Sequence, residues 1–282
     1  MLAAPQMTTD RGWHARLDLG FAISGRRTAL VRRSHSGPLQ VQRPFYPDAS
    51  GGCHVYVLHP PGGLVGGDRL VIDVTADTGA AALLTTPAAT KFYRTAGAKA
   101  EQRVSIRVAR GGVVEWLPQE TLVFGGADGE SRVDVDVESG GEFLGWEICG
   151  FGRPASGDHF ATGRFVQRLA VRVGGEPAVM ERAEFDGASG VMKRRIALAG
   201  FTVTGTFVAL TARAELAEQV RQVLPAATAT DLFSVTSRRR ALVCRYLGDS
   251  PERARSGFAR AWSVLRTALL GKASHPPRIW AT

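Results

Sequence analysis

The side chains of this sequence best suited to chemistry are five carboxylates and one histidine: Asp68, Glu115, Glu120, Glu147, Asp158 and His59. Glu115 and Glu147 lie in runs that are otherwise apolar, beside Trp116 and Trp146. A carboxylate buried in such a run needs a cationic or hydrogen-bonding partner. The partner can be a basic side chain in an internal salt bridge, and the carboxylates would then be structural. The candidate partners are Lys91, Arg94 and Arg153. Alternatively, the group can form a polar lining that holds a hydrated divalent ion weakly and lets it pass.

The remaining ligand-forming residues do not indicate a tightly bound metal. The six histidines are dispersed, a His-Glu-x-x-His motif is absent, and no Cys-x-x-Cys spacing joins Cys53, Cys149 and Cys244. High-affinity transition-metal sites favour clustered imidazole or thiolate ligands. We therefore expect no tightly bound cofactor, and we expect each cysteine to be a small buried hydrophobe in a reducing compartment.

A hydrolytic site is the main catalytic alternative. Ser156, Asp158 and His159 lie together in the chain, although the Gly-x-Ser-x-Gly motif is absent. A catalytic triad needs convergence in space, and neighbours on one loop do not easily reach the same atom. A hydrolase that uses Ser156 and His159 is kept as an alternative function.

The stretch from His59 to Asp68 reads HPPGGLVGGD and must position both of those residues. Proline restricts the backbone φ angle, and glycine allows φ angles that other residues avoid. The loop contains both kinds of residue: Pro60, Pro61, Gly62, Gly63, Gly66 and Gly67. Strand-like runs flank the loop at residues 55–58 and 70–74. A phosphate-binding loop would need a lysine where Asp68 stands and a helix after it. We therefore expect a corner between two strands where backbones pack closely.

The pattern of the first 210 residues is typical of β-structure. Apolar and polar residues alternate with period two at residues 15–21, 103–108 and 133–138, and glycine pairs separate several such runs. Further strand-like runs occupy residues 165–173, 179–185 and 194–210. The sequence therefore predicts a mainly β fold, with stacked sheets or a β-solenoid-like coil of many short strands.

We expect a few helices, mostly in the last third of the chain. Residues 212–224 have apolar side chains at helical spacing and stop at Pro225. Residues 251–270 form the clearest helix, with Ser250 as N-cap, Pro251 at the first position and Gly271 at the end. We expect a disordered leader at residues 1–12 and a single domain at 13–282. This domain divides into a β-rich part, 13–210, and a helix-containing part, 211–282.

The chain is basic, with a net charge of +9 and a pI near 10.2. A nucleic-acid-binding protein is therefore a second alternative, but the arginines are scattered singly along strand-like runs rather than clustered in one stripe. Docking to an acidic protein partner also fits the summed charge. No run of 18 apolar residues indicates a membrane span, and residues 1–10 do not resemble a signal peptide, so we expect a cytoplasmic protein.

Six stretches in a fixed order resemble the signatures of the UreD (UreH) family of urease accessory proteins. They are residues 42–47 (QRPFYP), 59–68 (HPPGGLVGGD), 86–94 (TPAATKFYR), 115–121 (EWLPQET), 152–157 (GRPASG) and 277–280 (PRIW). The resemblance covers about residues 14 to 280. One mild departure is Ala88-Ala89, where the family more often has a glycine.

The resemblance implies a scaffold for assembly of the urease nickel centre rather than an enzyme. The partners it implies are a UreF-like accessory protein, a UreG-like GTPase and the urease apoprotein, with no nucleic acid and no membrane. Nickel would be cargo in transit, and the five carboxylates with His59 are the candidates for its route. We expect the basic C-terminal helix and the tail to bind the UreF-like partner through Arg253, Arg260, Arg266, Arg278 and Trp280.

Overall fold

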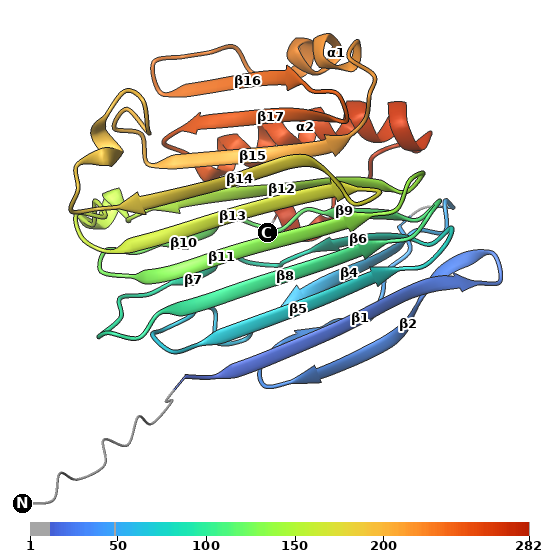
Figure 1. The fold of residues 1–282 in the computed structure, drawn as a ribbon, viewed down its shortest axis with the longest axis horizontal. Coiled ribbons are helices and arrows are strands. Elements are labelled where there is room, and N and C mark those ends of the chain that lie inside the picture. The colour runs from blue at the N-terminus through green and yellow to red at the C-terminus, as the bar shows by residue number, and fades with distance from the viewer. Residues whose placement is uncertain (1–11, 48, 282) are drawn as a thin grey trace, which may run out of the picture.

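A computed structural model describes residues 12–47 and 49–281 of the chain. Most of the expected leader, residues 1–12, lies outside the described residues. Two sheets dominate the fold (Figure 1). The outer sheet has the strand order β14 (Glu176–Asp186), β13 (Arg164–Val173), β11 (Asp128–Val137), β8 (Ala100–Val108), β5 (Arg69–Ala76), β1 (His14–Ser24) and β2 (Arg27–Ser36).

The central sheet lies between the outer sheet and the helices. Its order is β16 (Asp231–Ser237), β17 (Ala241–Gly248), β15 (Val203–Leu210), β12 (Glu142–Phe151), β9 (Val113–Trp116), β6 (Ala81–Thr85), β4 (Cys53–Leu58) and β3 (Gln40–Val41). Two short strands, β7 (Thr90–Phe92) and β10 (Thr121–Val123), continue it beside β12. From β4 to β13 the chain passes alternately between the two sheets, which confirms the predicted solenoid-like coil.

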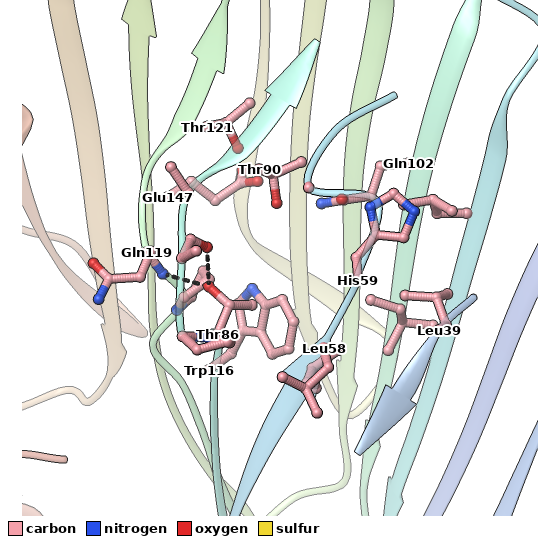
Figure 2. A pocket seen from close by; sticks show the side chains of 18 of the residues that line it. Leu39, Leu58, His59, Thr86, Thr90, Gln102, Trp116, Gln119, Thr121 and Glu147 are labelled. Atoms are coloured by element: carbon pink, nitrogen blue, oxygen red, sulfur yellow. Dashed lines mark hydrogen bonds between the residues drawn. The ribbon is translucent and has the colours of Figure 1, made fainter. Parts of the chain in front are cut away.

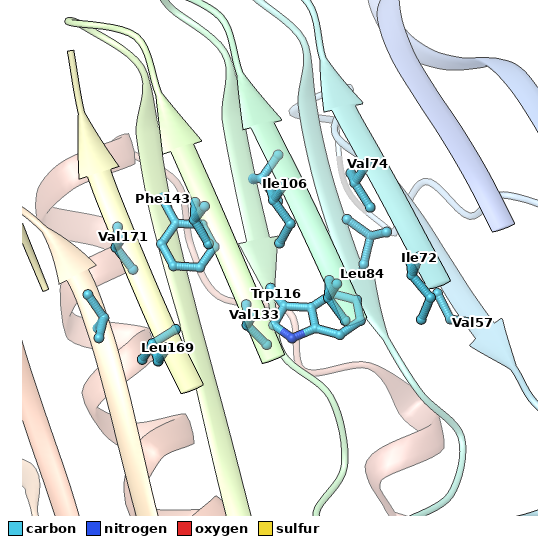
Figure 3. Packing of buried hydrophobic residues seen from close by; sticks show 14 of the residues in the cluster. Val57, Ile72, Val74, Leu84, Ile106, Trp116, Val133, Phe143, Leu169 and Val171 are labelled. Carbon is cyan, nitrogen blue, oxygen red and sulfur yellow. The ribbon is translucent and has the colours of Figure 1, made fainter. Parts of the chain in front are cut away.

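In-register parallel pairing stacks the coils. Leu17, Ile72, Val104, Val133 and Leu169 occupy one row across β1, β5, β8, β11 and β13. All five side chains are buried, face the central sheet and belong to one hydrophobic cluster. Figure 3 shows part of this cluster, including Ile72, Val133 and Leu169. Because side chains alternate along a strand, the same strands place arginines and carboxylates on the other face.

Helices form a third layer against the central sheet. The main one, α2 (Pro251–Leu270), packs on β12, β15 and β17 and beside α1 (Leu216–Val223). The predicted end signals are confirmed: the Ser250 side chain accepts a hydrogen bond from the Arg253 N–H, Pro251 begins the helix, and Gly271 ends it with φ 63°. These helices and their sheet face enclose a second buried apolar cluster.

Two expectations about strands are wrong. Residues 194–202, expected to be extended, form turns after a short 3-10 helix, Val191–Lys193, because Ala199 and Gly200 have φ values of 52° and 92°. Conversely, β16 and β17 lie in the helix-containing part, 211–282, beyond residue 210, where we expected the strands to end. The hairpin turns at the basic residues 238–240, and β17 then supplies the buried run that begins at Ala241.

Candidate functional site

A cavity of about 240 Å³, partly open to the solvent, lies where three strands of the central sheet end. β4, β6 and β9 each stop at a proline-containing corner, and the prolines Pro60, Pro87 and Pro118 all line the cavity. Three of the sequence signatures, in residues 59–68, 86–94 and 115–121, therefore form consecutive corners of the coil. β12 runs past this break without interruption and places Glu147 in the cavity wall (Figure 2).

The glycines of the first corner are required by its backbone. Gly62 and Gly67 have φ values of 75° and 92°, a region that other residues avoid. A Cβ atom on Gly63 would lie 2.3 Å from the Tyr93 ring, and one on Gly66 would lie 2.0 Å from the Thr95 hydroxyl oxygen. The expected close packing of backbones at this corner is thus present in the structure.

Asp68 holds the end of that corner. Its carboxylate accepts hydrogen bonds from the backbone N–H groups of Trp13 at 2.8 Å and Val65 at 2.9 Å. The side chain is buried and is not among the residues that line the cavity. Asp68 therefore acts on the corner's conformation, whereas His59, at the other end of the same loop, lines the cavity.

Glu147 and His59 are the predicted route residues that reach the cavity. Protein surrounds the Glu147 carboxyl, and burial raises its pKa to about 8. Burial also lowers the pKa of His59, while the charge of Asp68 opposes that shift. Both groups therefore favour their neutral forms at neutral pH, and the other polar groups of the lining include Thr86, Thr90, Gln102, Gln119 and Thr121.

A row of polar side chains continues from the cavity into the space between the sheets. On the outer sheet, Gln102, Ser131 and Gln167 occupy adjacent inward positions. Gln167 donates a hydrogen bond to Glu147 at 3.3 Å, and Ser131 also bonds to that carboxyl. On the central sheet, Glu147 is in register with Thr206 of β15 and through it with Arg245 of β17.

The far end of this polar row is closed by Glu181 of β14. Its carboxylate accepts a hydrogen bond from the Thr206 hydroxyl at 3.3 Å and forms an ion pair with Arg245. We call the set Gln102, Ser131, Gln167, Glu147, Thr206, Glu181 and Arg245 the interior polar row. The rows on either side of Gln102, Ser131 and Gln167 are apolar, with Val104, Val133 and Leu169 on one side and Ala100, Gly129 and Phe165 on the other.

Two other predicted route residues have fixed partners elsewhere. Glu115 is buried in the helical layer, where Arg266 donates to both of its oxygens at 3.1 Å and Trp262 donates at 2.5 Å. Glu120 lies at a corner beside the cavity and accepts from Arg255 of α2 at 2.9 Å. The same guanidinium donates to the Gln119 side chain at 2.6 Å. Arg255 of α2 therefore holds Gln119, a residue of the cavity wall, in place.

Asp158 lies in an open hollow on the surface, together with Ser156 and His159. Its oxygens accept from the N–H groups of Gly125 at 2.9 Å and Phe160 at 3.0 Å. Burial tends to raise the pKa of Asp158, but these two bonds, with Arg153 and Arg94, hold it below its usual value. Among the bonds that the structure gives Asp158, none goes to His159, so the Asp–His pair of a catalytic triad is not formed here.

The predicted partner-binding residues divide into two groups. Arg260 and Arg278 are exposed, and Arg253 is half exposed while it pairs with Asp231 at 2.8 Å. Arg266 is buried in its ion pair with Glu115, so its charge does not reach a surface.

The tail after α2 turns back onto the helical layer. Trp280 packs against Trp146 and Trp262 at ring-centre distances of 5.3 and 5.8 Å. Its indole N–H donates to the Thr85 hydroxyl at 2.9 Å. The tail therefore wraps back onto the helical layer.

The outer face of the outer sheet carries many of the arginines that raise the net charge. Arg103, Arg132, Arg168 and Arg182 are adjacent across four strands. Each lies within 4 Å of a carboxylate, as in the pairs Arg168–Glu130 at 2.9 Å and Arg182–Glu184 at 2.6 Å. This alternation of charges does not form the continuous basic stripe that a nucleic-acid-binding surface requires.

Sequence reasoning missed Gln102, Ser131, Gln167, Glu181, Thr206 and Arg245. A signal for three of them exists, because Gln102, Ser131 and Gln167 each occupy the apolar phase of an alternating strand pattern. In residues 12–47 and 49–281, no group of three or more His, Cys, Asp or Glu side chains could hold a metal ion. Within the same ranges, no helix is both long and apolar enough to cross a membrane.

Comparisons with known proteins agree with the ordered signatures. A family model described as "UreD urease accessory protein" matches residues 14–281. Urease accessory protein UreD 2 of Brucella anthropi is 42% identical over 96% of this chain and 99% of its own length. UreD proteins of Azoarcus sp. and Chromohalobacter salexigens are each 44% identical, over 96% and 97% of this chain and 95% and 90% of their own lengths. The chain therefore belongs to the UreD family of urease accessory proteins.

Proposed function

We propose that this chain is a scaffold rather than an enzyme, that it serves GTP-dependent insertion of nickel into urease, and that nickel passes through its interior. The observation that carries the proposal is the interior polar row. It links a cavity bounded by the family-like corners to the edge of the sheets, through a core that is otherwise apolar. Polar side chains in such a core cost free energy unless they are used or satisfied.

The chemistry of this interior suits weak and transient binding. The cavity offers one imidazole, one carboxyl and several hydroxyl and amide groups. Tight nickel sites use more imidazole or thiolate than this. A conduit must bind an ion well enough for entry and weakly enough for release. Because the pKa of Glu147 is raised to about 8, an arriving cation must first displace its proton, which weakens binding further.

Partner proteins supply what this sequence lacks. It has no phosphate-binding loop, so a UreG-like GTPase would hydrolyse the nucleotide. We assign the contact with a UreF-like partner to the exposed face of α2 and the tail, through Arg253, Arg260 and Arg278. Trp280 would support this surface from below, since it packs on the core. The urease apoprotein would receive the nickel, and the assembly would work in the cytoplasm.

The test is co-expression of urease and its other accessory proteins with this chain, without it, or with a variant. Glu147→Gln keeps the shape of the side chain but cannot become an anion. We expect nickel per urease active site to fall at least tenfold without the chain, and to fall strongly with Glu147→Gln. Glu176→Gln, at an exposed glutamate, is the matched control. Normal nickel content without the chain would refute the scaffold, and normal content with Glu147→Gln would refute the route.

A further inference from the structure

Two of the six signature stretches meet in the open hollow on the surface, which we call the surface hollow. Residues 86–94 contribute Tyr93 and Arg94 to its lining, and residues 152–157 contribute Arg153. The lining of the cavity contains none of these three side chains. The surface hollow has a volume of about 590 Å³ and is open to the solvent, so it can admit a chemical group that is carried on a larger molecule.

The two arginines of the surface hollow have unused hydrogen-bonding capacity. The guanidinium of Arg153 stacks on the Phe124 ring at 4.4 Å, and its Nε lies 3.7 Å from an Asp158 oxygen, too far for a hydrogen bond. The side chain of Arg94 lies against Gly126, where a Cβ would be 3.0 Å from its Cγ. Among the residues that the structure describes, neither guanidinium donates a hydrogen bond, although each carries several N–H donors.

Arginines elsewhere on the surface are engaged by carboxylates. Arg132, Arg164 and Arg182 donate to carboxylate oxygens at 2.5, 2.7 and 2.6 Å. In the surface hollow the charge of one carboxylate, Asp158, acts on both guanidiniums, and its two oxygens already accept from backbone N–H groups. One carboxylate does not neutralise two guanidiniums, so the surface hollow keeps a net positive charge.

The backbone around the surface hollow is tightly constrained. Gly152 has a φ of 76°, and a Cβ there would lie 2.4 Å from the carbonyl oxygen of Asp158. Phe160 is buried with a φ of 50°, a conformation that a bulky residue rarely adopts. Strain of this kind persists only where the surrounding contacts enforce it, and it is concentrated at functional sites. The two guanidiniums therefore stand on a fixed support, which lowers the cost of binding a ligand.

We propose that the surface hollow binds an oxoanion, a carboxylate or phosphate group carried on a larger molecule, through Arg94 and Arg153. The planar fork of a guanidinium matches the oxygens of either group. The hydroxyls of Ser156 and Thr162 and the imidazole of His159 line the same hollow and are further donors. This site is independent of the proposed nickel route, because neither arginine lines the cavity.

Isothermal titration calorimetry at constant ionic strength tests this site with two probes, inorganic phosphate and glutarate. The protein is the full-length chain with a solubility tag, and the tag alone is the blank. We expect a Kd of about 1 mM or tighter for the better probe. Arg153→Gln and Arg94→Gln should each weaken it about tenfold, because each removes a charged donor. Arg153→Lys keeps the charge but not the fork, and it should lose less.

Arg182→Gln is the matched control. The Arg182 side chain is 48% exposed, against 53% for Arg153, but its guanidinium pairs with Glu184. Binding in this variant should equal that of the wild type. Circular dichroism checks that all the variants are folded.

The two probes distinguish the possible sources of the oxoanion. Tighter binding of phosphate assigns a phosphoryl group and tighter binding of glutarate assigns a carboxylate, and either result supports the site if both arginine variants weaken it. Equal affinities for Arg153→Gln, Arg94→Gln and Arg182→Gln would overturn the proposal, since the anion would then bind the basic surface at large. Absence of binding of both probes to the wild type would overturn it as well.

Discussion

Two interior layers of this molecule each contain a glutamate beside a tryptophan, and they neutralise it differently: Glu115 is buried, whereas Glu147 is partly exposed in the cavity wall. In the helical layer, Glu115 receives two bonds from Arg266 and one from Trp262. In the layer between the sheets, Glu147 receives a long hydrogen bond from Gln167 and contacts no cation. The two residues look alike in the sequence, but only the second lies in the cavity wall.

The difference separates a structural carboxylate from one that is available for binding. Burial raises the pKa of Glu115, but Arg266 opposes this shift and supplies a permanent counter-charge. Glu147 has no such partner, so burial raises its pKa to about 8 and a bound proton neutralises the carboxyl at neutral pH. A proton can be exchanged for another cation, whereas a guanidinium fixed by α2 and by the Ala273 carbonyl cannot leave easily.

The largest effect should come from breaking the pair in the helical layer. Arg266→Met leaves Glu115 buried without its counter-charge, and the free energy of unfolding should fall by about 3–5 kcal/mol. Urea denaturation at pH 7 measures this loss. Arg266→Met/Glu115→Gln should recover most of it, because an amide needs no counter-charge. A loss below about 1 kcal/mol for the single variant would show that Glu115 is not held as an anion.

The layer between the sheets should respond to pH instead. Between the unfolded value near 4.5 and the folded value near 8, the native state binds the Glu147 proton and the unfolded state does not. Stability should therefore fall as pH rises through this window, by at most about 1.4 kcal/mol per pH unit. Glu147→Gln lacks the proton and should lack this part of the slope.

Thermal unfolding from pH 6 to 8 checks the sign. Relative to Glu147→Gln, the wild type should lose about 2 kcal/mol across the two units, and the difference should level off above pH 8. Glu176→Gln, which changes an exposed carboxylate, should track the wild type. Parallel curves for wild type and Glu147→Gln would mean that Glu147 is charged in the native protein, and the comparison of the two glutamates would fail.

Local signals in the sequence predict much of the fold, but they do not distinguish the structural Glu115 from Glu147 in the cavity wall. Period-two alternation and turn glycines are short-range, so the β class and helix α2 with its caps could be predicted. Glu115 and Arg266 are 151 residues apart, and nothing local indicates that they meet. Asp68 and Asp158 likewise bond to backbone N–H groups that only the folded corners bring near. Glu147 could be singled out as a polar residue in an apolar run, but not told from Glu115.

The smallest effect concerns Trp280, which tests whether the tail belongs to the helical layer or to a partner. Its ring packs on Trp146 and Trp262, and its N–H bonds to Thr85. Because the side chain is half-buried, Trp280→Ala should lower the free energy of unfolding by about 2 kcal/mol, less than a fully buried tryptophan would. Trp280→Phe keeps most of the ring contacts and should lose about 1 kcal/mol with the hydrogen bond.

Ni²⁺ affinity should not change in either Trp280 variant, because Trp280 is not part of the cavity lining and the interior polar row lies on the opposite face of the central sheet. Urea denaturation and equilibrium dialysis on the same preparations measure both quantities. If Trp280→Ala unfolds like the wild type but no longer co-purifies with its accessory partner, the ring is a partner contact and the tail leaves the core in the complex. The helical layer would then bind a partner as well as support the central sheet. The distinction between a purely structural helical layer and a binding layer between the sheets would no longer hold.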